Sequence, residues 1–361
     1  LYRRLHQIAQ ELKERIPDER ERKFVADVQI LLNDREQMSP QSYRQQLCEV
    51  RETIEAMRAV DTPTALHSRA VVQHELARHK LAQWSEVRAG YEAALAKYKE
   101  SEGDEADVLR GLCTADYSQM LFDGRNYKDS VSSFQEARRN LDAPALVIAT
   151  LCQEADASRK LQPIPNMTHA LKCLQEAEDH DGLPEDHPLR AHVAQRRAWV
   201  QMDSWQFSKA IESFNRGQAL RAIDAEAVTA QTTSFALWSR QGVAMAHHFL
   251  GEKQKVIDEF DQLLSDIPDA AGTADYQQRR KSERGPNVYE CYADWFLFGT
   301  DADCRRAAEL LHEAVQQTEY LHFEEDFRAP YVLRLRYKLL LARALASQSR
   351  DEEPNGPSGK D

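Results

Sequence analysis

The sequence contains no run of apolar residues near the roughly 18 that a membrane span needs, and no signal-peptide pattern. Glycine and proline are scarce, with 13 of each in 361 residues. The six cysteines include no C-x-x-C pair, which argues against a disulfide framework and favours reduced thiols in a cytoplasmic protein. A chain rich in Ala, Leu, Glu, Gln and Arg, with few helix breakers, is predicted to be all-α.

An excess of positive charge is also missing. Lys and Arg number 47 against 59 Asp and Glu, for a formal net charge of -12. A nucleic-acid-binding protein needs a basic stripe to displace counterions from phosphates. The only local basic cluster, within residues 277–285, is too small for that role. We therefore expect neither a nucleic acid nor a membrane as a partner.

Motifs that would indicate an enzyme are absent. The sequence has no G-x-x-x-x-G-K-[ST], no G-x-G-x-x-G and no G-x-S-x-G, so neither a phosphate cradle nor a nucleophile elbow is predicted. The segment HELARH resembles a zinc-protease helix, but His74 and His79 are five residues apart instead of four and would point to different faces. We interpret them as surface histidines. The sequence predicts a non-enzymatic protein without a cofactor or a metal.

What the sequence does contain is a repeat. Six segments share a small or β-branched residue, a bulky apolar residue four positions later and usually a small one three positions after that. Spacings of i, i+4 and i+7 place all three on one helical face. The six triplets are Val87/Tyr91/Ala94, Ser130/Phe134/Ala137, Ala170/Leu174/Ala177, Ala210/Phe214/Gly217, Val256/Phe260/Leu263 and Ala307/Leu311/Ala314. Their first members are 40 to 51 residues apart, which leaves room for two helices per repeat.

A partner helix precedes each of the central triplets. Twelve residues before the triplet begins stands a small residue where two helices could approach closely: Ser118, Ser158, Ala198 or Ala244. Three residues before the triplet stands a bulkier one that would close the turn between the helices: Trp84, Tyr127, Met167 or Phe207.

The segment 240–268 resembles a tetratricopeptide repeat. Val243 and Ala244 match the large-small pair of its first helix, Gly251 the turn glycine and Pro268 the closing proline. The segment 113–144 is similar, with Gly124 in the turn. The repeats here are longer than the family's usual 34 residues. The resemblance implies a right-handed superhelical solenoid of antiparallel helix pairs.

This architecture predicts four regions. Residues 1–60 would form N-terminal helices that cap the array, residues 61–320 about six helix pairs, and residues 321–348 a C-terminal capping helix. Residues 349–361 are rich in Pro, Gly and charge and are predicted to be a disordered tail.

In such an array the first helix of each pair would line a concave groove. Residues at i, i+3, i+7 and i+10 of these helices include Trp, Met, Gln, His and Arg, a mixture suited to holding a peptide. The predicted peptide-binding residues are Gln119, Phe122, Arg159, Gln162, His192, Gln195, Trp199, Met202, Trp238, Gln241, Met245 and His248.

The sequence thus predicts a protein-protein interaction scaffold that binds a protein or peptide segment in its groove, with self-association also open. Two alternatives remain. The chain could be the sensor or regulatory region of a larger signalling protein whose catalytic part (ATPase, kinase, protease or transcription regulator) lies outside it. It could also be an enzyme built as a closed ring of helices, but such rings place catalytic acids in long loops, of which this chain has few.

Overall fold

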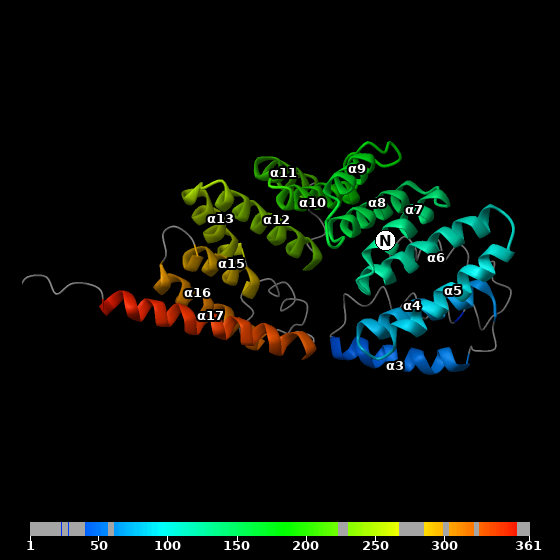
Figure 1. Ribbon diagram of the computed structural model, residues 1–361, viewed down its shortest axis with the longest axis horizontal. Helices are drawn as coiled ribbons and strands as arrows, with labels where there is room; N and C mark the ends of the chain where they lie inside the picture. Colours follow the sequence, from blue (N-terminus) through cyan, green and yellow to red (C-terminus); the bar gives the residue numbers. More distant parts are fainter. Residues whose placement is uncertain are drawn as a thin grey trace, which may run out of the picture. The chain divides into compact units, whose positions relative to one another are not determined.

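The computed structural model describes residues 23, 28, 40–56, 61–222, 230–266, 285–298, 303–320 and 325–351 (Figure 1). These residues form α-helices joined by turns, and none of them lies in a strand. The first helices along the chain are α3 (Pro40–Ala56), α4 (Pro63–Arg78), α5 (Trp84–Glu100), α6 (Asp104–Asp123), α7 (Tyr127–Arg139), α8 (Pro144–Arg159), α9 (Met167–Glu178) and α10 (Pro188–Asp203). They are followed by α11 (Phe207–Ala222), α12 (Ala230–Phe249), α13 (Lys253–Asp266), α15 (Gly285–Phe298), α16 (Cys304–Tyr320) and α17 (Glu325–Asp351). The all-α prediction is confirmed.

The chain divides into two compact units, Leu1–Gln206 and Phe207–Asp361, with the boundary between α10 and α11. In the first unit α4 packs on α5, α6 on α7 and α8 on α9, and α10 then lies against both α8 and α9. In the second unit α12 packs on α11 and α13, α15 on α16, and α17 on α16. Each unit is therefore a stack of neighbouring helices that meet along the chain order.

The repeated triplets form the core of both units. Every member of the six triplets is buried, as the spacing predicts. Tyr91, Phe134, Phe214 and Phe260 are among the largest fully buried side chains. Burying a side chain of this size contributes about 2 kcal/mol or more, so these positions carry much of the packing energy.

The four small residues that precede the central triplets are completely buried: Ser118, Ser158, Ala198 and Ala244. At one crossing the Ser130 hydroxyl of α7 donates to the Ser118 carbonyl oxygen of α6 at 2.9 Å. A hydroxyl with a backbone partner can be buried without the cost of an unsatisfied polar group. Serine therefore serves as a small residue at this position.

Four turns between consecutive helices share a backbone conformation. The helices that follow the predicted turn-closing residues begin at those residues: Trp84, Tyr127, Met167 and Phe207. The turns after α4, α6, α10 and α12 each contain one residue with a positive φ, and the next residue's N–H bonds the carbonyl five positions earlier, a Schellman arrangement; the turn after α8 does not contain one. The left-handed residues are Lys80, Arg125, Trp205 and Gly251.

One turn differs from the sequence alignment. Gly124, which we matched to the turn glycine, has φ -74 and needs no glycine for its backbone. Arg125 occupies the left-handed position instead, with φ 64, at the place equivalent to Gly251. Arg125, and not Gly124, corresponds to Gly251 because Arg125 and Gly251 both stand two positions before the next helix begins.

Three predictions lie wholly or mostly outside the described residues. They concern the N-terminal helices expected before residue 35, the closing proline Pro268 and the basic cluster. Helix α17 ends at Asp351, three residues into the segment predicted to be disordered, and the rest of that segment lies outside the described residues. The six cysteines are free; Cys113, Cys152 and Cys173 are buried and Cys48 is exposed. Of the described helices, none is long and apolar enough to cross a membrane.

The left-handed turn position gives a stability prediction. A Cβ at Gly251 would have no neighbour within 4 Å, so Gly251→Ala should cost only the strain of φ +74, about 1 kcal/mol. Arg125→Gly should relieve the same strain and raise the free energy of unfolding by up to about 1 kcal/mol. Urea unfolding followed by circular dichroism measures both. A Gly251→Ala variant as stable as the parent would contradict this account of the turn.

Candidate functional site

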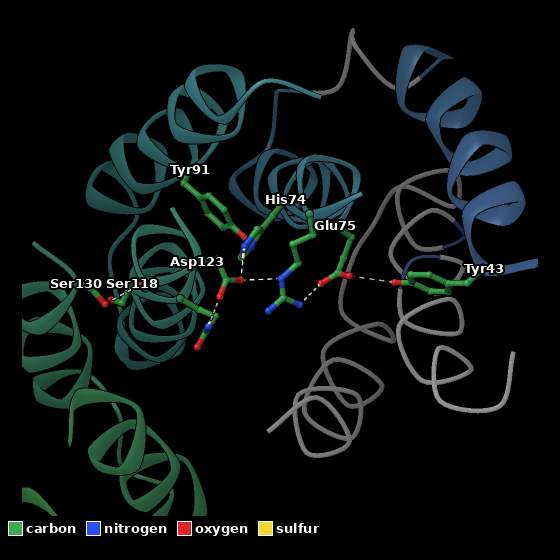
Figure 2. Close-up of polar contacts among 9 residues, drawn as sticks. Tyr43, His74, Glu75, Tyr91, Ser118, Asp123 and Ser130 are labelled. Atoms are coloured by element: carbon green, nitrogen blue, oxygen red, sulfur yellow. Dashed lines mark hydrogen bonds and ion pairs between the residues drawn. The ribbon is translucent and has the colours of Figure 1, made fainter. Parts of the chain in front are cut away.

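The first helices of the first unit contact one another as well as their partners, since α4 lies against α6, α6 against α8 and α8 against α10. Polar side chains at these contacts form a continuous network through α3, α4, α5 and α6. Figure 2 shows its course from Tyr43 through Glu75 to Asp123, with His74 and Tyr91 on one side.

Asp123 at the end of α6 is the centre of this network. Its carboxylate accepts from His74 Nε2 at 3.0 Å and from Arg78 Nε at 2.6 Å. Gln119 Nε2 donates to its second oxygen at 2.8 Å. Burial by itself would raise the pKa of Asp123, but the hydrogen bonds from His74 and Arg78 and the charge of Arg78 outweigh it and lower the pKa to about 2.

The network continues toward the N-terminus through Arg78. Its Nη1 donates to Glu75 Oε1 at 2.8 Å, and the Tyr43 hydroxyl of α3 donates to Glu75 Oε2 at 3.3 Å (Figure 2). Glu75 is buried, and the bonds from Arg78 and Tyr43 offset the cost of burying its carboxylate. The arginine thus links two carboxylates that belong to α4 and α6.

His74 and Asp123 resemble part of a catalytic dyad, but their surroundings indicate a structural pair. A neutral imidazole satisfies both neighbours if Nε2–H donates to Asp123 and Nδ1 accepts from the Tyr91 hydroxyl, 3.5 Å away. His74 and Tyr91 are both buried, so a substrate has no access to the ring. Our interpretation of His74 as a surface histidine was wrong, because α5 and α6 cover it.

Comparable contacts join later first helices. In the first unit Arg196 of α10 bonds Asp156 of α8 at 2.8 Å, and Arg159 of α8 bonds Asp203 of α10 at 3.1 Å. In the second unit Arg334 of α17 bonds Glu290 of α15 at 2.7 Å. Charged side chains therefore connect successive first helices in the first unit and join α15 to α17 in the second.

Three of the residues predicted to bind a peptide are buried: Gln195, Met202 and Gln241. Gln241 Nε2 donates to Asn287 Oδ1 of α15 at 3.0 Å. The prediction that these side chains face an open groove was wrong, because all three are buried and, at Gln241, α15 packs over the face assigned to a ligand.

Three others are half-buried and held by neighbours. Gln119 bonds Asp123, and Arg159 bonds Asp203. Phe122 lies edge-on to Tyr127, with Lys160 Nζ 4.6 Å from its ring centre. These contacts orient the side chains but leave part of each accessible to solvent.

The remaining predicted residues are also accessible. His192 and Trp199 of α10 are half-buried, and Gln162, just after α8, is exposed. On α12 the accessible side chains are Trp238, Met245 and His248, with Trp238 37% exposed. The structure therefore leaves nine of the twelve predicted residues at least partly accessible, in two separate units.

The ion pairs between first helices were not predicted from the sequence, although the sequence contains a signal for them. Asp156 and Arg196 are 40 residues apart, close to the spacing of the triplets. Glu290 and Arg334 are separated by a similar distance. Opposite charges one repeat apart on the first helices would have predicted these contacts.

The depressed pKa of Asp123 gives a pH prediction. A folded-state pKa near 2, below the ordinary 3.8, means that ionised Asp123 stabilises the fold above about pH 4, and that this contribution is lost as the pH falls toward 2. Asp123→Asn should lower the free energy of unfolding by about 2 kcal/mol at pH 7. The difference between variant and parent should shrink between pH 4 and pH 2 in urea titrations.

The exposed Asp142 of the same unit supplies the control for this experiment. Asp142→Asn should change stability little at any pH. An Asp123→Asn effect that stays constant down to pH 2 would show that the charge of Asp123 does not stabilise the fold.

No protein-family model matches the sequence, and no curated protein is significantly similar to it. Solved structures do share its fold. A Rap protein complexed with Competence and Sporulation Factor is similar at 11% identity over 96% of this chain and 94% of that one, with a TM-score of 0.56. A signal transduction ATPase with a tetratricopeptide repeat sensor, from Pyrococcus horikoshii, is similar at 13% identity over 96% of this chain and 52% of that one, with a TM-score of 0.51. The chain is therefore an all-α helical repeat solenoid with a tetratricopeptide-like fold.

Proposed function

We propose that this protein is a non-enzymatic interaction scaffold whose first helices bind a peptide segment of a protein partner. The observation that supports this most directly is the accessible face of α12. Trp238, Met245 and His248 recur at i, i+7 and i+10, and all three are accessible to solvent. Trp and Met provide adaptable apolar contact area, which suits an apolar side chain of a bound peptide.

Rigidity is the physical basis of binding on such a face. Gln241, which lies among these residues on α12, is tied to α15 by its bond to Asn287. A helix held by its neighbours presents its side chains in fixed positions, so less conformational entropy is lost when a partner binds. The Rap neighbour, which is complexed with Competence and Sporulation Factor, makes it reasonable that a solenoid of this fold holds a second molecule.

The first unit offers a face of the same kind. Trp199 and His192 of α10 remain accessible in part, as do Phe122 and Gln119 of α6. We propose that these residues also contact a partner. The regulatory alternative stays compatible with this function, because a sensor region acts by binding too.

Single tryptophan variants test the two faces separately. Trp238→Ala and Trp199→Ala should each leave the helical circular dichroism unchanged and weaken binding of a partner, isolated by affinity capture and then purified, at least tenfold. Binding is measured by titration calorimetry with the purified partner.

Gln262→Ala, on the exposed surface of α13, is the matched control and should not change the affinity. Affinities unchanged in both tryptophan variants, with the helical content retained, would exclude the first helices as the binding surface.

A further inference from the structure

A cluster of metal-ligand side chains lies between α8 and α9, away from the accessible faces of the first helices. Glu154 of α8 and His169 and Cys173 of α9 place one ligand atom each within 4.8 Å of the others. His169 and Cys173 are four residues apart on one helix, so they project from the same side. Glu154 and Cys173 are buried, and His169 is half-buried.

His169 Nε2 has more polar neighbours than it can bond through a single proton. This nitrogen lies 2.7 Å from Glu154 Oε1, 3.4 Å from Cys173 Sγ and 3.4 Å from Gln135 Nε2. A neutral imidazole nitrogen either donates one hydrogen bond or accepts one. A divalent cation, in contrast, binds a nitrogen, an oxygen and a sulfur at the same time.

We propose that Glu154, His169 and Cys173 form a Zn²⁺ site. Imidazole nitrogen, thiolate sulfur and carboxylate oxygen are all ligands that zinc accepts in a tetrahedral arrangement. On one tetrahedral ion, nitrogen and sulfur ligands lie about 3.5 Å apart, close to the observed 3.4 Å between His169 Nε2 and Cys173 Sγ. The nitrogen and the carboxylate oxygen need to separate by about 0.6 Å.

Neighbouring side chains hold the carboxylate in place without occupying the ligand atoms completely. Arg138 Nε lies 3.0 Å from Glu154 Oε2, the oxygen that faces away from His169, and Gln135 Nε2 donates to Oε1 at 3.0 Å. Outer groups of this kind orient metal ligands and tune their affinity. Both come from α7, so three helices would meet at the ion.

The charges around the cluster balance when the ion is present. Arg138 also pairs with Glu176, 2.7 Å away, which brings a second carboxylate to the cluster. With Cys173 as a thiolate, the three negative charges match those of Arg138 and Zn²⁺. Binding releases the thiol proton of Cys173 to solvent, and no electron transfer is involved. Because His169 is half-buried, solvent reaches the cluster, and water can take the fourth ligand position of the ion.

Cobalt titration of the chelator-treated full chain tests the site. One equivalent of Co²⁺ should give the visible absorption of tetrahedral cobalt and a thiolate-to-cobalt charge-transfer band, and Zn²⁺ should displace both. Cys173→Ser should abolish the charge-transfer band, and His169→Ala should weaken Co²⁺ binding at least tenfold. Cys48→Ser, which removes an exposed thiol, should leave the spectrum unchanged.

Thermal unfolding provides a second readout, because an ion that binds only the folded chain stabilises it. Zn²⁺ should raise the unfolding temperature of the parent and of Cys48→Ser, and should not raise that of His169→Ala. A cobalt spectrum that persists in Cys173→Ser, or that is lost in Cys48→Ser, would overturn the proposal, as would the absence of any Zn²⁺-dependent shift in the parent.

A second, independent observation concerns the outer face of α17. Leu333, Tyr337, Leu340 and Leu341 recur at i, i+4, i+7 and i+8 and are all exposed, Tyr337 to 71% and Leu340 to 61%. They lie on the opposite side of the helix from the buried Leu335, Leu339 and Ala342, which belong to the core of the second unit. Neighbouring exposed apolar side chains of this kind mark a surface for contact with a partner. We call these four residues the α17 stripe.

The charges beside the α17 stripe indicate what binds there. Arg336 and Arg343, which are exposed, lie along one edge, and residues 331–347 contain no acidic side chain although the chain as a whole is acidic. We infer that the α17 stripe binds an amphipathic helix of a protein partner with acidic residues beside its apolar face. A second copy would fit poorly, since pairing α17 with itself sets arginines against arginines.

Synthetic peptides test this inference separately from the proposed binding of a partner on the first helices. A helical peptide with leucines at i, i+4, i+7 and i+11 flanked by glutamates should bind the full chain, and the same peptide with lysine flanks should bind at least tenfold more weakly. Leu340→Glu should weaken the glutamate peptide at least tenfold. Gln316→Glu, which adds the same charge on exposed α16 surface, should not.

Three results would overturn the choice of partner. They are equal binding of both peptides, a dimer in analytical ultracentrifugation that Leu340→Glu dissociates, and binding to anionic phospholipid vesicles that depends on Leu340.

Discussion

Each helix pair depends on a bulky side chain of one helix being buried where a small residue of the other allows close approach. Phe134 on α7 is buried beside a crossing at which Ser130 meets the Ser118 backbone. A larger residue at position 118 would push the two helices apart and open a cavity around the aromatic ring, which costs several kcal/mol in a packed core. The turns and the stacking of successive pairs follow from this spacing.

Because the repeats stack, the first helices have two roles that use the same side chains. They contact the first helices of neighbouring repeats, and under the proposed function they also bind the partner. Charged residues mostly serve the first role: Asp123 and Asp156 each bond a partner on an adjacent first helix. Of the nine predicted binding residues that stay accessible, four are apolar: Phe122, Trp199, Trp238 and Met245.

The buried cluster at Glu154 and the α17 stripe are both exceptions to the repeat. At the triplet positions paired helices meet through small and apolar residues, whereas here a carboxylate, an imidazole and a thiol meet next to an arginine. Burying a charge requires compensation by partners or an ion. The exposed apolar face of α17 likewise differs from the polar surface that most helices present to solvent. Such departures from a repeated pattern are where a function beyond folding is best sought.

The sequence by itself determined that the chain is helical and which side chains form its core. Periodicity of i, i+4 and i+7 identified Tyr91, Phe214 and the other triplet members as buried, because a helix has only one face that can point inward at that spacing. The residues that begin the second helices followed from the same repeat. Local chemistry and short spacings carry this information, so no knowledge of distant contacts was needed.

Only the tertiary structure decided which polar residues face a partner and which face the protein itself. Gln241 is buried because α15 lies over it, and His74 is buried because α5 and α6 enclose it; neither fact can be obtained from one helix alone. Glu154 is 15 residues from His169 in the sequence, and nothing in their spacing predicts that their side chains meet. Contacts between helices depend on crossing geometry, which the pattern along a single helix does not encode.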